Sequence, residues 1–540
     1  MRHFSKGIIA GAAAAFLAAA TPAAHAATCG DLNGDGGLSV ADCTLLLDVA
    51  VGPPDPANLC GGSGAAQCGD LNGDAAINTA DVSACLLTVS GGETVNPLCA
   101  PQPVQIACPG GVKDITGDIN SSQTWITGCT YRIDRLIKVA GGVTLGIQAG
   151  VKVVAKKVPT PPATVSALIF LRDSKFNMTG TSANRILFTS DQNEAALGTA
   201  GNPKGKGDWG GLVLNGRAPV NVPGGEGLSE GLDSVPFGGN ESNDSSGVMQ
   251  FVQVEFAGKV VGLDNELNLI THNAIGQGSV MDHLAAHTGL DDAFEWFGGN
   301  VKERFLVASS AGDDNLDWQL GYTGAVQFAT VWQDINQVET GGSNAIEADN
   351  NENNFNATPI SNPKMCNITL CGTADQPLAA QPVNQFGLLL RRGTSGRVAN
   401  AIVEGFRQGA VRIQHNETSA QFATGPTGSC TLNPSTGMWN SRVFNNASDA
   451  SSANITGSFC TASEIFAAWG PRGVQSGIDP QVDCSSPANL VPPGASPVAG
   501  AGTDCSTLFG DAFFQTTNYI GAFVPGGANW SQPWATYPAN

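Results

Sequence analysis

The stretch GGVTLGIQAGVKVVAKK (141–157) decides the fold, because its apolar and polar residues alternate with the period of a β-strand and glycines interrupt it at short intervals. Similar segments recur further along the chain: FVQVEFAG (251–258), HLAAHTG (283–289), FLVASSAG (305–312), VQFATVW (326–332) and VANAIVEGF (398–406). A repeat of roughly 20 to 30 residues with two or three short strands is the unit of a parallel β-helix. The sequence therefore predicts a mainly β protein, with a right-handed parallel β-helix over residues 104–540. A β-sandwich with irregular loops is the alternative.

The overall charge limits the partners of the chain. Its 540 residues include 46 Asp and Glu against 26 Lys and Arg, for a formal net charge of −20. This charge repels the phosphates of nucleic acids and the surface of anionic membranes. Charged residues are only 13% of the chain, whereas glycine occurs 69 times, as is typical of an extracellular protein with many short strands and tight turns. We therefore expect no nucleic-acid partner.

The N-terminus has the parts of a secretory signal peptide. A basic start (Arg2 to Lys6) precedes an apolar run (Gly7 to Ala20) and a small-residue cleavage site that ends at Ala26. We expect residues 1–26 to be removed and the protein to be exported to the extracellular space or the cell surface. The apolar run is too short for a membrane span, and no later apolar run reaches the roughly 18 residues that a span needs.

The cysteines fit an exported protein. There are 14 of them, an even number, which predicts disulfides. Local pairs are plausible, although the sequence leaves the connectivity open: Cys108–Cys129, Cys366–Cys371, Cys430–Cys460 and Cys484–Cys505.

A calcium-loop sequence occurs twice near the N-terminus. The loop that begins at Asp31 recurs 39 residues later at Asp70. Each copy places oxygen ligands at the loop positions that calcium requires. The predicted ligands are Asp31, Asn33, Asp35, the Gly37 carbonyl, Ser39 and Asp42 in the first loop, and Asp70, Asn72, Asp74, the Ala76 carbonyl, Asn78 and Asp81 in the second. Residues 27–103 contain nine carboxylates and no Lys or Arg, so a bound cation would relieve their repulsion.

Each loop is followed by a short apolar helical segment (40–51 and 79–89), and this arrangement resembles the type I dockerin, a calcium-dependent assembly module. The resemblance covers a module at residues 27–103 and implies binding to a cohesin-like partner. The family's contact positions correspond to Val40, Ala41, Thr79 and Ala80. The second loop departs from the pattern because Ala75 replaces the glycine of the sharp turn, so we expect weaker calcium binding there.

The remainder of the chain also resembles a known family. KGDWGGLVLNGRAPVN (206–221) and the ending YIGAFVPGGANWSQPWATY (519–537) are similar to secreted bacterial β-helix proteins. This likeness implies the β-helix fold and an extracellular setting, but no particular activity.

Acidic rows are the main candidate for a functional site in the β-helix. Asp291-Asp292 and Asp313-Asp314 lie 22 residues apart after equivalent strands, which predicts that they meet at one edge of adjacent coils. Related acidic residues are Glu255, Asp264, Glu266, Glu295, Asp317, Glu347 and Asp349. Two interpretations follow. In the first, the four Asp residues act as general acid and base; the Asp-Asp pairs resemble those of pectin hydrolases with a β-helix fold, and this resemblance implies that Arg412 binds substrate. In the second, they bind cations and loop backbones. We expect the second.

The histidines and the sequence motifs of known enzyme classes indicate no further metal site or catalytic site. A strand from His283 to His287 would place both side chains on one face about 13 Å apart, too far to share a metal, so we expect surface or core roles for them and for His272. The motifs of serine hydrolases, zinc proteases and nucleotide-binding loops do not occur in the sequence. A polysaccharide lyase would use calcium and a Lys or Arg base, for which Lys302 and Arg304 follow the first acidic row.

The sequence as a whole favours an exported calcium-binding protein whose β-helix binds extracellular polysaccharide. A dockerin-tethered polysaccharide hydrolase or lyase is one alternative. A purely structural surface protein is the other.

Overall fold

The computed structural model describes Cys43, Cys85 and most of the chain from Val104 onwards. The described segments after the two cysteines are 104–157, 165–232, 234–262, 265–338, 342–376 and 385–539. The chain divides into two compact units, Met1–Gln102 and Pro103–Asn540. In the first unit, Cys43 and Cys85 form a disulfide. The predicted signal peptide, both predicted calcium loops and the predicted cohesin contacts lie outside the described residues.

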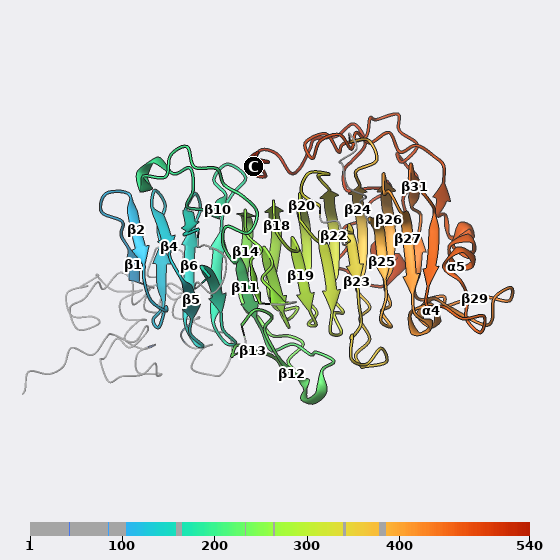
Figure 1. The fold of residues 1–540 in the computed structure, drawn as a ribbon, viewed down its shortest axis with the longest axis horizontal. Coiled ribbons are helices and arrows are strands. Elements are labelled where there is room, and N and C mark those ends of the chain that lie inside the picture. Colours follow the sequence, from blue (N-terminus) through green and yellow to red (C-terminus); the bar gives the residue numbers. More distant parts are fainter. Residues whose placement is uncertain are drawn as a thin grey trace, which may run out of the picture. The chain divides into compact units, whose positions relative to one another are not determined.

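The second unit is a parallel β-helix, which confirms the predicted fold class (Figure 1). One parallel sheet of ten strands forms what we call the first face. Its strands, in spatial order, are β5 (Leu136–Val139), β8 (Ala167–Phe170), β11 (Leu212–Asn215), β17 (Ile270–Asn273), β19 (Phe294–Phe297), β21 (Leu316–Gln319), β23 (Ile346–Ala348), β25 (Phe386–Leu390), β27 (Gly409–Gln414) and β32 (Ala450–Ala453).

A 17-stranded sheet folds over a corner and forms the second and third faces. In the first coils the two faces have separate strands: β1 (Val104–Ile106), β3 (Gln123–Trp125), β6 (Thr144–Gln148) and β9 (Lys175–Thr179) on the second, and β2 (Val112–Ile115), β4 (Thr130–Ile133), β7 (Lys152–Ala155) and β10 (Ile186–Ser190) on the third. Six long strands then serve both faces: β14 (Gly247–Glu255), β18 (Val280–His287), β20 (Lys302–Ser309), β22 (Ala325–Trp332), β24 (Lys364–Cys371) and β26 (Arg397–Glu404). The last strands are β30 (Gly437–Trp439), β31 (Arg442–Phe444) and β33 (Gln475–Ser476).

Each long strand turns the corner at a single residue in the left-handed conformation. The six residues, with φ between 50° and 61°, are Phe251, His283, Phe305, Phe328, Asn367 and Asn400. Asparagine tolerates this conformation, whereas the bulkier residues stack on one another: the ring centroids of His283 lie 4.3 Å from those of both Phe251 and Phe305. This bend corrects the prediction that His283 and His287 share one strand face, because His283 sits at the corner itself.

The coil interior is packed with apolar side chains from all three faces. Trp296 and Trp318 occupy neighbouring inward positions of the first face and are at most 1% exposed. The interior also holds one polar pair: His272 Nε2 lies 3.2 Å from Glu303 Oε1, and both side chains are fully buried. Burial lowers the pKa of His272 to about 3 and raises that of Glu303 to about 8. Both groups are therefore neutral at pH 7, and the three histidines are core or packing residues, as expected.

Short strands, helices and turns lie outside the three faces of the coil. Residues 216–246, which we call the insert, follow β11 and contain the antiparallel strands β12 (Glu226–Leu228) and β13 (Pro236–Gly238). The other short strands are β15 (Val260–Gly262), β16 (Asn265–Glu266), β28 (Ala423–Thr424) and β29 (Thr431–Leu432); the helices are α4 (Asn416–Phe422), α5 (Ala462–Trp469) and α6 (Cys505–Phe509), with 3-10 turns at Ala195–Leu197, Pro223–Gly225 and Gly470–Arg472. No helix in the described segments is long and apolar enough to span a membrane.

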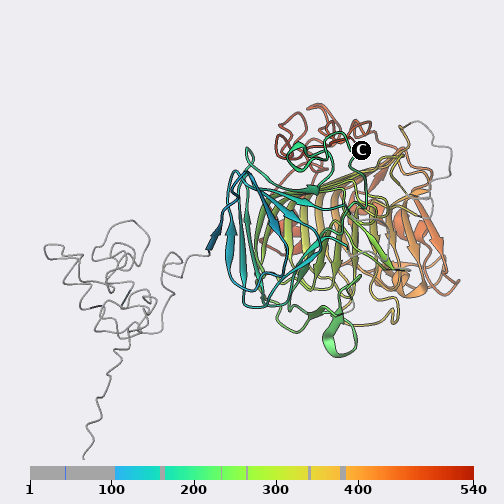
Figure 2. The same cartoon turned by 60° about the vertical axis from the view of Figure 1, so that its left-hand side comes forward.

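The last segment, residues 477–539, runs back along the corner of the long strands, and we call it the C-terminal arm. Figure 2 shows it in red on one side of the coil, with the insert in green on the opposite side. The corner asparagines hold the arm: Asn400 Nδ2 donates to Thr503 O (2.8 Å) and Asn367 Nδ2 donates to Tyr519 O (3.0 Å). Further along the arm, Trp534 packs edge-on against Phe251.

Two disulfides also fasten the arm and correct the predicted pairing. Cys366 pairs with Cys505 and Cys371 pairs with Cys484, so the local pairs Cys366–Cys371 and Cys484–Cys505 were wrong. Both Cys366 and Cys371 belong to β24, where an extended chain rises about 3.3 Å per residue and holds them beyond the roughly 4.4–6.8 Å that a disulfide spans between Cα atoms. The predicted pairs Cys108–Cys129 and Cys430–Cys460 are confirmed. These disulfides are typical of an extracellular protein.

Candidate functional site

The outward side of the first face carries a column of oxygen-bearing side chains. Thr271, Glu295, Asp317 and Glu347 share one register position on the paired strands β17, β19, β21 and β23. Their neighbours along each strand are buried, so the alternation of a β-strand turns these four side chains outward. We call Glu295, Asp317 and Glu347 the acidic column. The two acidic rows of the sequence therefore do lie on adjacent strands.

Three overlapping groups of carboxylates along this column are close enough to share metal ions. The groups are Asp291 with Asp292 and Asp313, Asp292 with Glu295 and Asp317, and Asp314 with Asp317 and Glu347. Within each group, one oxygen from each residue lies within 4.8 Å of the others. Oxygen ligands at such spacing suit a hard cation such as calcium. Glycosidase carboxyl groups are separated by about 5–9.5 Å, so the tighter spacing favours cation binding over an acid–base pair.

Two buried oxygen atoms in the column are free to accept a ligand. Among the described residues, Asp317 Oδ1 and Thr271 Oγ1 have no hydrogen-bond partner. Asp317 is 8% exposed and Thr271 is 2% exposed, so bulk water does not satisfy them. An unpaired buried polar atom costs about 1–3 kcal/mol. A cation bound to the column, or its coordinated water, would remove that cost.

The electrostatics of the column agree with this interpretation. Burial, reinforced by neighbouring carboxylates, raises the pKa of Asp292, Glu295 and Asp317 well above the ordinary range. The same causes raise the pKa of Asp314 to about 8. Carboxylates this close cannot all ionise at neutral pH unless a cation compensates their charge.

Asp292 and Asp314, the second residues of the two Asp-Asp pairs, accept hydrogen bonds from the backbone of the next coil. Asp292 Oδ1 accepts a hydrogen bond from the N–H of Asp314 (2.8 Å), and Asp314 Oδ1 accepts one from the N–H of Asn344. Asn268 and Asn344 make the same bond on either side, Asn268 Oδ1 to the N–H of Asp292 (3.2 Å) and Asn344 Oδ1 to the N–H of Phe386 (3.1 Å). We call Asn268, Asp292, Asp314 and Asn344 the ladder. Of the four Asp residues predicted as site candidates, Asp292 and Asp314 therefore belong to the ladder, whereas Asp291 and Asp313 do not.

A cavity of about 570 Å³ adjoins the acidic column and brings arginines beside it. Its lining includes Asp313, Glu347, Phe386, Arg391 and Arg412. Arg391 forms ion pairs with Glu347 and Asp349. The Arg412 guanidinium lies 5.1 Å from the centroid of the Phe386 ring, and within the described part of the chain it forms no ion pair. Arg412, identified from the sequence as a substrate-binding candidate, is therefore available to an anionic ligand.

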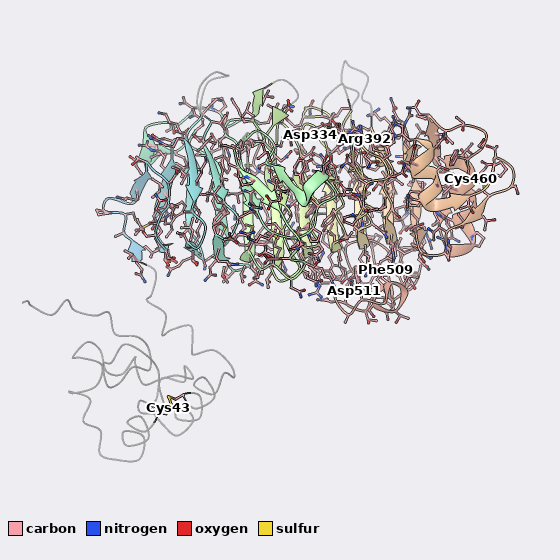
Figure 3. All side chains as sticks on the ribbon, turned by 90° about the horizontal axis from the view of Figure 1, so that it is seen from below. Cys43, Asp334, Arg392, Cys460, Phe509 and Asp511 are labelled. Carbon is pink, nitrogen blue, oxygen red and sulfur yellow. A yellow bond between two sulfur atoms is a disulfide. The ribbon has the colours of Figure 1, made fainter. Side chains whose placement is uncertain are left out.

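Other predicted residues lie elsewhere. Lys302 pairs with Asp511 of the arm, and Arg304 lies over the Phe513 ring, so neither reaches the acidic column. Figure 3 shows Asp511 and Arg392, which follows β25 on the first face, on opposite sides of the coil. Glu255 lies on the third face and accepts a hydrogen bond from Thr189. Asp264 lies outside the described residues.

Three residues of the site escaped the sequence analysis. The Glu230 side chain of the insert lies within hydrogen-bonding reach of the Glu295 and Asn268 side chains. Arg391 and Phe386 stand at the two ends of the apolar segment FGLLLRR (386–392). The Arg391-Arg392 pair directly after an apolar strand was a usable indication, since charged residues there fall at a strand end. Nothing in the sequence near Glu230 indicates its contact with a strand 65 residues away.

Comparisons with known proteins give one match. A family model described as a pectate-lyase-like β-helix domain matches residues 117–466. No curated protein matches the chain. No solved structure matches it.

Proposed function

Because the chain belongs to the pectate-lyase-like β-helix family, we propose that it binds an acidic extracellular polysaccharide on the outward side of the first face. Membership of this family relates the chain to polysaccharides. The observation that carries the finer proposal is the cavity in which the unpaired Arg412 stands beside Glu347 and Asp313. This cavity is therefore lined by both positively and negatively charged side chains.

The two signs of charge have complementary tasks. Arg412 pairs with a sugar carboxylate, since a guanidinium fits a carboxylate with two parallel hydrogen bonds. Divalent cations on the acidic column, calcium by preference for oxygen ligands, bridge the protein to further carboxylates of the ligand. The bridge is necessary because the chain has a formal net charge of −20 and would otherwise repel a polyanion.

Replacing Arg412 by Ala should weaken the binding of polygalacturonate in calcium chloride about tenfold or more, because a charge-assisted hydrogen bond contributes about 1.5–3 kcal/mol. Isothermal titration calorimetry measures this. Lys138→Ala is the matched control, since Lys138 occupies the same outward position on β5, beyond the insert. A chelator should abolish binding by the unaltered protein. Equal affinities of the unaltered protein and Arg412→Ala would contradict the proposal.

A polysaccharide lyase on the same surface is the second candidate, favoured by one observation: Arg412 forms no ion pair among the described residues and lines the same cavity as Glu347 and Asp313. In such a reaction a base removes the proton next to the sugar carboxylate, the bond to the leaving sugar breaks, and the departing oxygen takes up a proton from water, which leaves an unsaturated sugar and a free hydroxyl. Ultraviolet absorbance of that product during incubation with polygalacturonate distinguishes cleavage from binding alone.

The N-terminal module adds an assembly function to the proposal. Its support is the duplicated calcium loop of the sequence and the resemblance to dockerins, with Val40, Ala41, Thr79 and Ala80 as the surface for a cohesin-like partner. Calcium at these loops organises the module and anchors the polysaccharide-binding β-helix to an assembly.

In the full chain, Asp31→Ala should reduce calcium binding more than Asp70→Ala. The reason is that the second loop already lacks the glycine of the turn at Ala75. Calorimetric titration of calcium into each variant measures the loss. Asp55→Ala is the control, because Asp55 lies between the loops and outside both ligand sets. A larger loss for Asp70→Ala would reverse the assignment of the stronger site.

A further inference from the structure

We infer that the insert closes one end of the groove on the first face, so that the site takes the end of a polysaccharide chain and excludes its internal segments. The inference rests on the proposed function and concerns how the ligand enters the site. It would make the insert the element that sets the specificity of this surface.

The insert covers the outward side of the first face before the acidic column begins. Leu232 and Val235 of the insert form one apolar cluster with Ile169 of β8 and Val213 of β11. Ile169 and Val213 occupy the same register column as Glu295 and are fully buried. Leu232 and Val235 pack over these two outward side chains and separate them from solvent. A ligand therefore cannot continue along the face across β8 and β11.

The tip of this cover meets the acidic column directly. The Glu230 side chain lies within hydrogen-bonding reach of that of Glu295, one strand before Asp317. The following residue, Gly231, has φ +67°, and a Cβ there would lie 2.7 Å from Leu267 Cδ2. Only glycine allows the insert to seat this closely. The cover ends where the oxygen ligands begin.

Further hydrogen bonds and an ion pair anchor the insert to neighbouring coils. Asn273 Nδ2 donates to Ser229 Oγ (2.7 Å), and Asn221 Nδ2 donates to Asn350 Oδ1 (2.8 Å). Arg172 of the preceding coil pairs with Glu226 (2.6 Å). These bonds connect the insert to strands and loops on both sides of β11, so it forms a fixed wall of the groove.

The other end of the groove is different. The outward column continues from Glu347 through Leu389 of β25 and Arg412 of β27 to Ser451 of β32. Arg412 is partly exposed and lines the cavity, in contrast to Ile169 and Val213 beneath the insert. The lining of the cavity runs from Asp313, just before β21, to Arg412 of β27, which is three strand spacings, or about 14 Å at about 4.8 Å each. It is thus short, closed at one end and accessible at the other.

The test is the binding stoichiometry of the full protein with oligogalacturonates and polygalacturonate of increasing length in calcium chloride. We expect one protein per saccharide chain at every length, and an affinity that stops rising after a few sugar units. A number of bound proteins that grows with chain length would overturn the inference while leaving the proposed function intact. Absence of binding at every length would reject the proposed function itself.

Shortening the insert provides the complementary variant. Replacement of Glu226–Gly238 by a short glycine-containing turn should open the wall, so that long chains bind more than one protein. Ser234→Ala is the matched control, because Ser234 is an exposed residue of the insert; this change keeps the wall and should keep a stoichiometry of one. Removal of Leu232 and Val235 exposes Ile169 and Val213, so folding of the shortened variant is checked by its melting curve. If it does not fold, the stoichiometry of the unaltered protein decides.

Discussion

Without divalent cations, the β-helix should lose stability as the pH rises from about 4 to about 8. Burial raises the pKa of Asp292, Glu295, Asp314 and Asp317 in the folded protein, whereas carboxylates of the unfolded chain keep ordinary pKa values of about 4. Between these values the folded state binds more protons than the unfolded state. The free energy of unfolding therefore falls with increasing pH across this window. Below about pH 4 both states are protonated, and the effect disappears.

Calcium should reverse this dependence. Its ligands must be deprotonated, so its stabilising effect should be small at low pH and large near pH 8. Tryptophan fluorescence during thermal melting measures the β-helix alone, because all nine tryptophans lie between Trp125 and Trp534. Asp317→Asn is the decisive variant, since Asp317 belongs to two of the three carboxylate groups while the N-terminal loops stay intact. It should melt higher than the unaltered protein in chelator at high pH and lose most of the gain from calcium. A melting temperature in chelator that does not fall with pH would contradict the prediction.

Asp292→Ala should destabilise the β-helix by about 1–3 kcal/mol, whereas Asp292→Asn should be tolerated. The alanine variant leaves the buried N–H of Asp314 without its acceptor on the ladder. The asparagine variant keeps an acceptor at the same atom and removes a buried acidic group from a crowded site. Asn268 and Asn344 already use an amide in this way on the neighbouring coils. The comparison therefore separates the hydrogen bond from the charge.

Urea unfolding in chelator, monitored by tryptophan fluorescence, gives these differences. Asp291→Ala is the matched control, because Asp291 is the adjacent carboxylate but not a ladder residue; it should leave stability unchanged or raise it. If Asp292→Asn proved as harmful as Asp292→Ala, the ladder hydrogen bond would not be the role of Asp292.

The fold was predictable because the alternation of apolar and polar residues along a strand is a local property of the sequence. Segments such as FVQVEFAG (251–258) and FLVASSAG (305–312) carry the strand period and recur at the spacing of a coil. The offset of 22 residues between Asp291 and Asp313 equals one coil, so stacking alone brings the acidic rows together. Arg412 was named from the sequence by likeness to a substrate-binding Arg of pectin hydrolases, and its role in binding stays a prediction.

The corner of the long strands was not predictable in this way. A single left-handed residue, such as His283 or Asn367, turns the chain between two faces, yet the surrounding segment keeps the pattern of one continuous strand. The disulfide partners of Cys366 and Cys371 also depend on the tertiary structure. Each pairs with a cysteine of the C-terminal arm, more than 100 residues away in the sequence. Sequence proximity therefore suggested the wrong partners.

The sequence by itself determined the period of the coil, the position of the acidic rows on adjacent strands and the duplicated calcium-loop pattern, since each depends on spacing along the chain. Only the tertiary structure decided which Asp of each pair holds a neighbouring backbone N–H, that Arg412 stands unpaired beside Glu347, and that Glu230 reaches Glu295 from the insert. These relations join residues from different coils. Their energies come from burial and from hydrogen bonds that form only when the coils stack, so no local pattern encodes them.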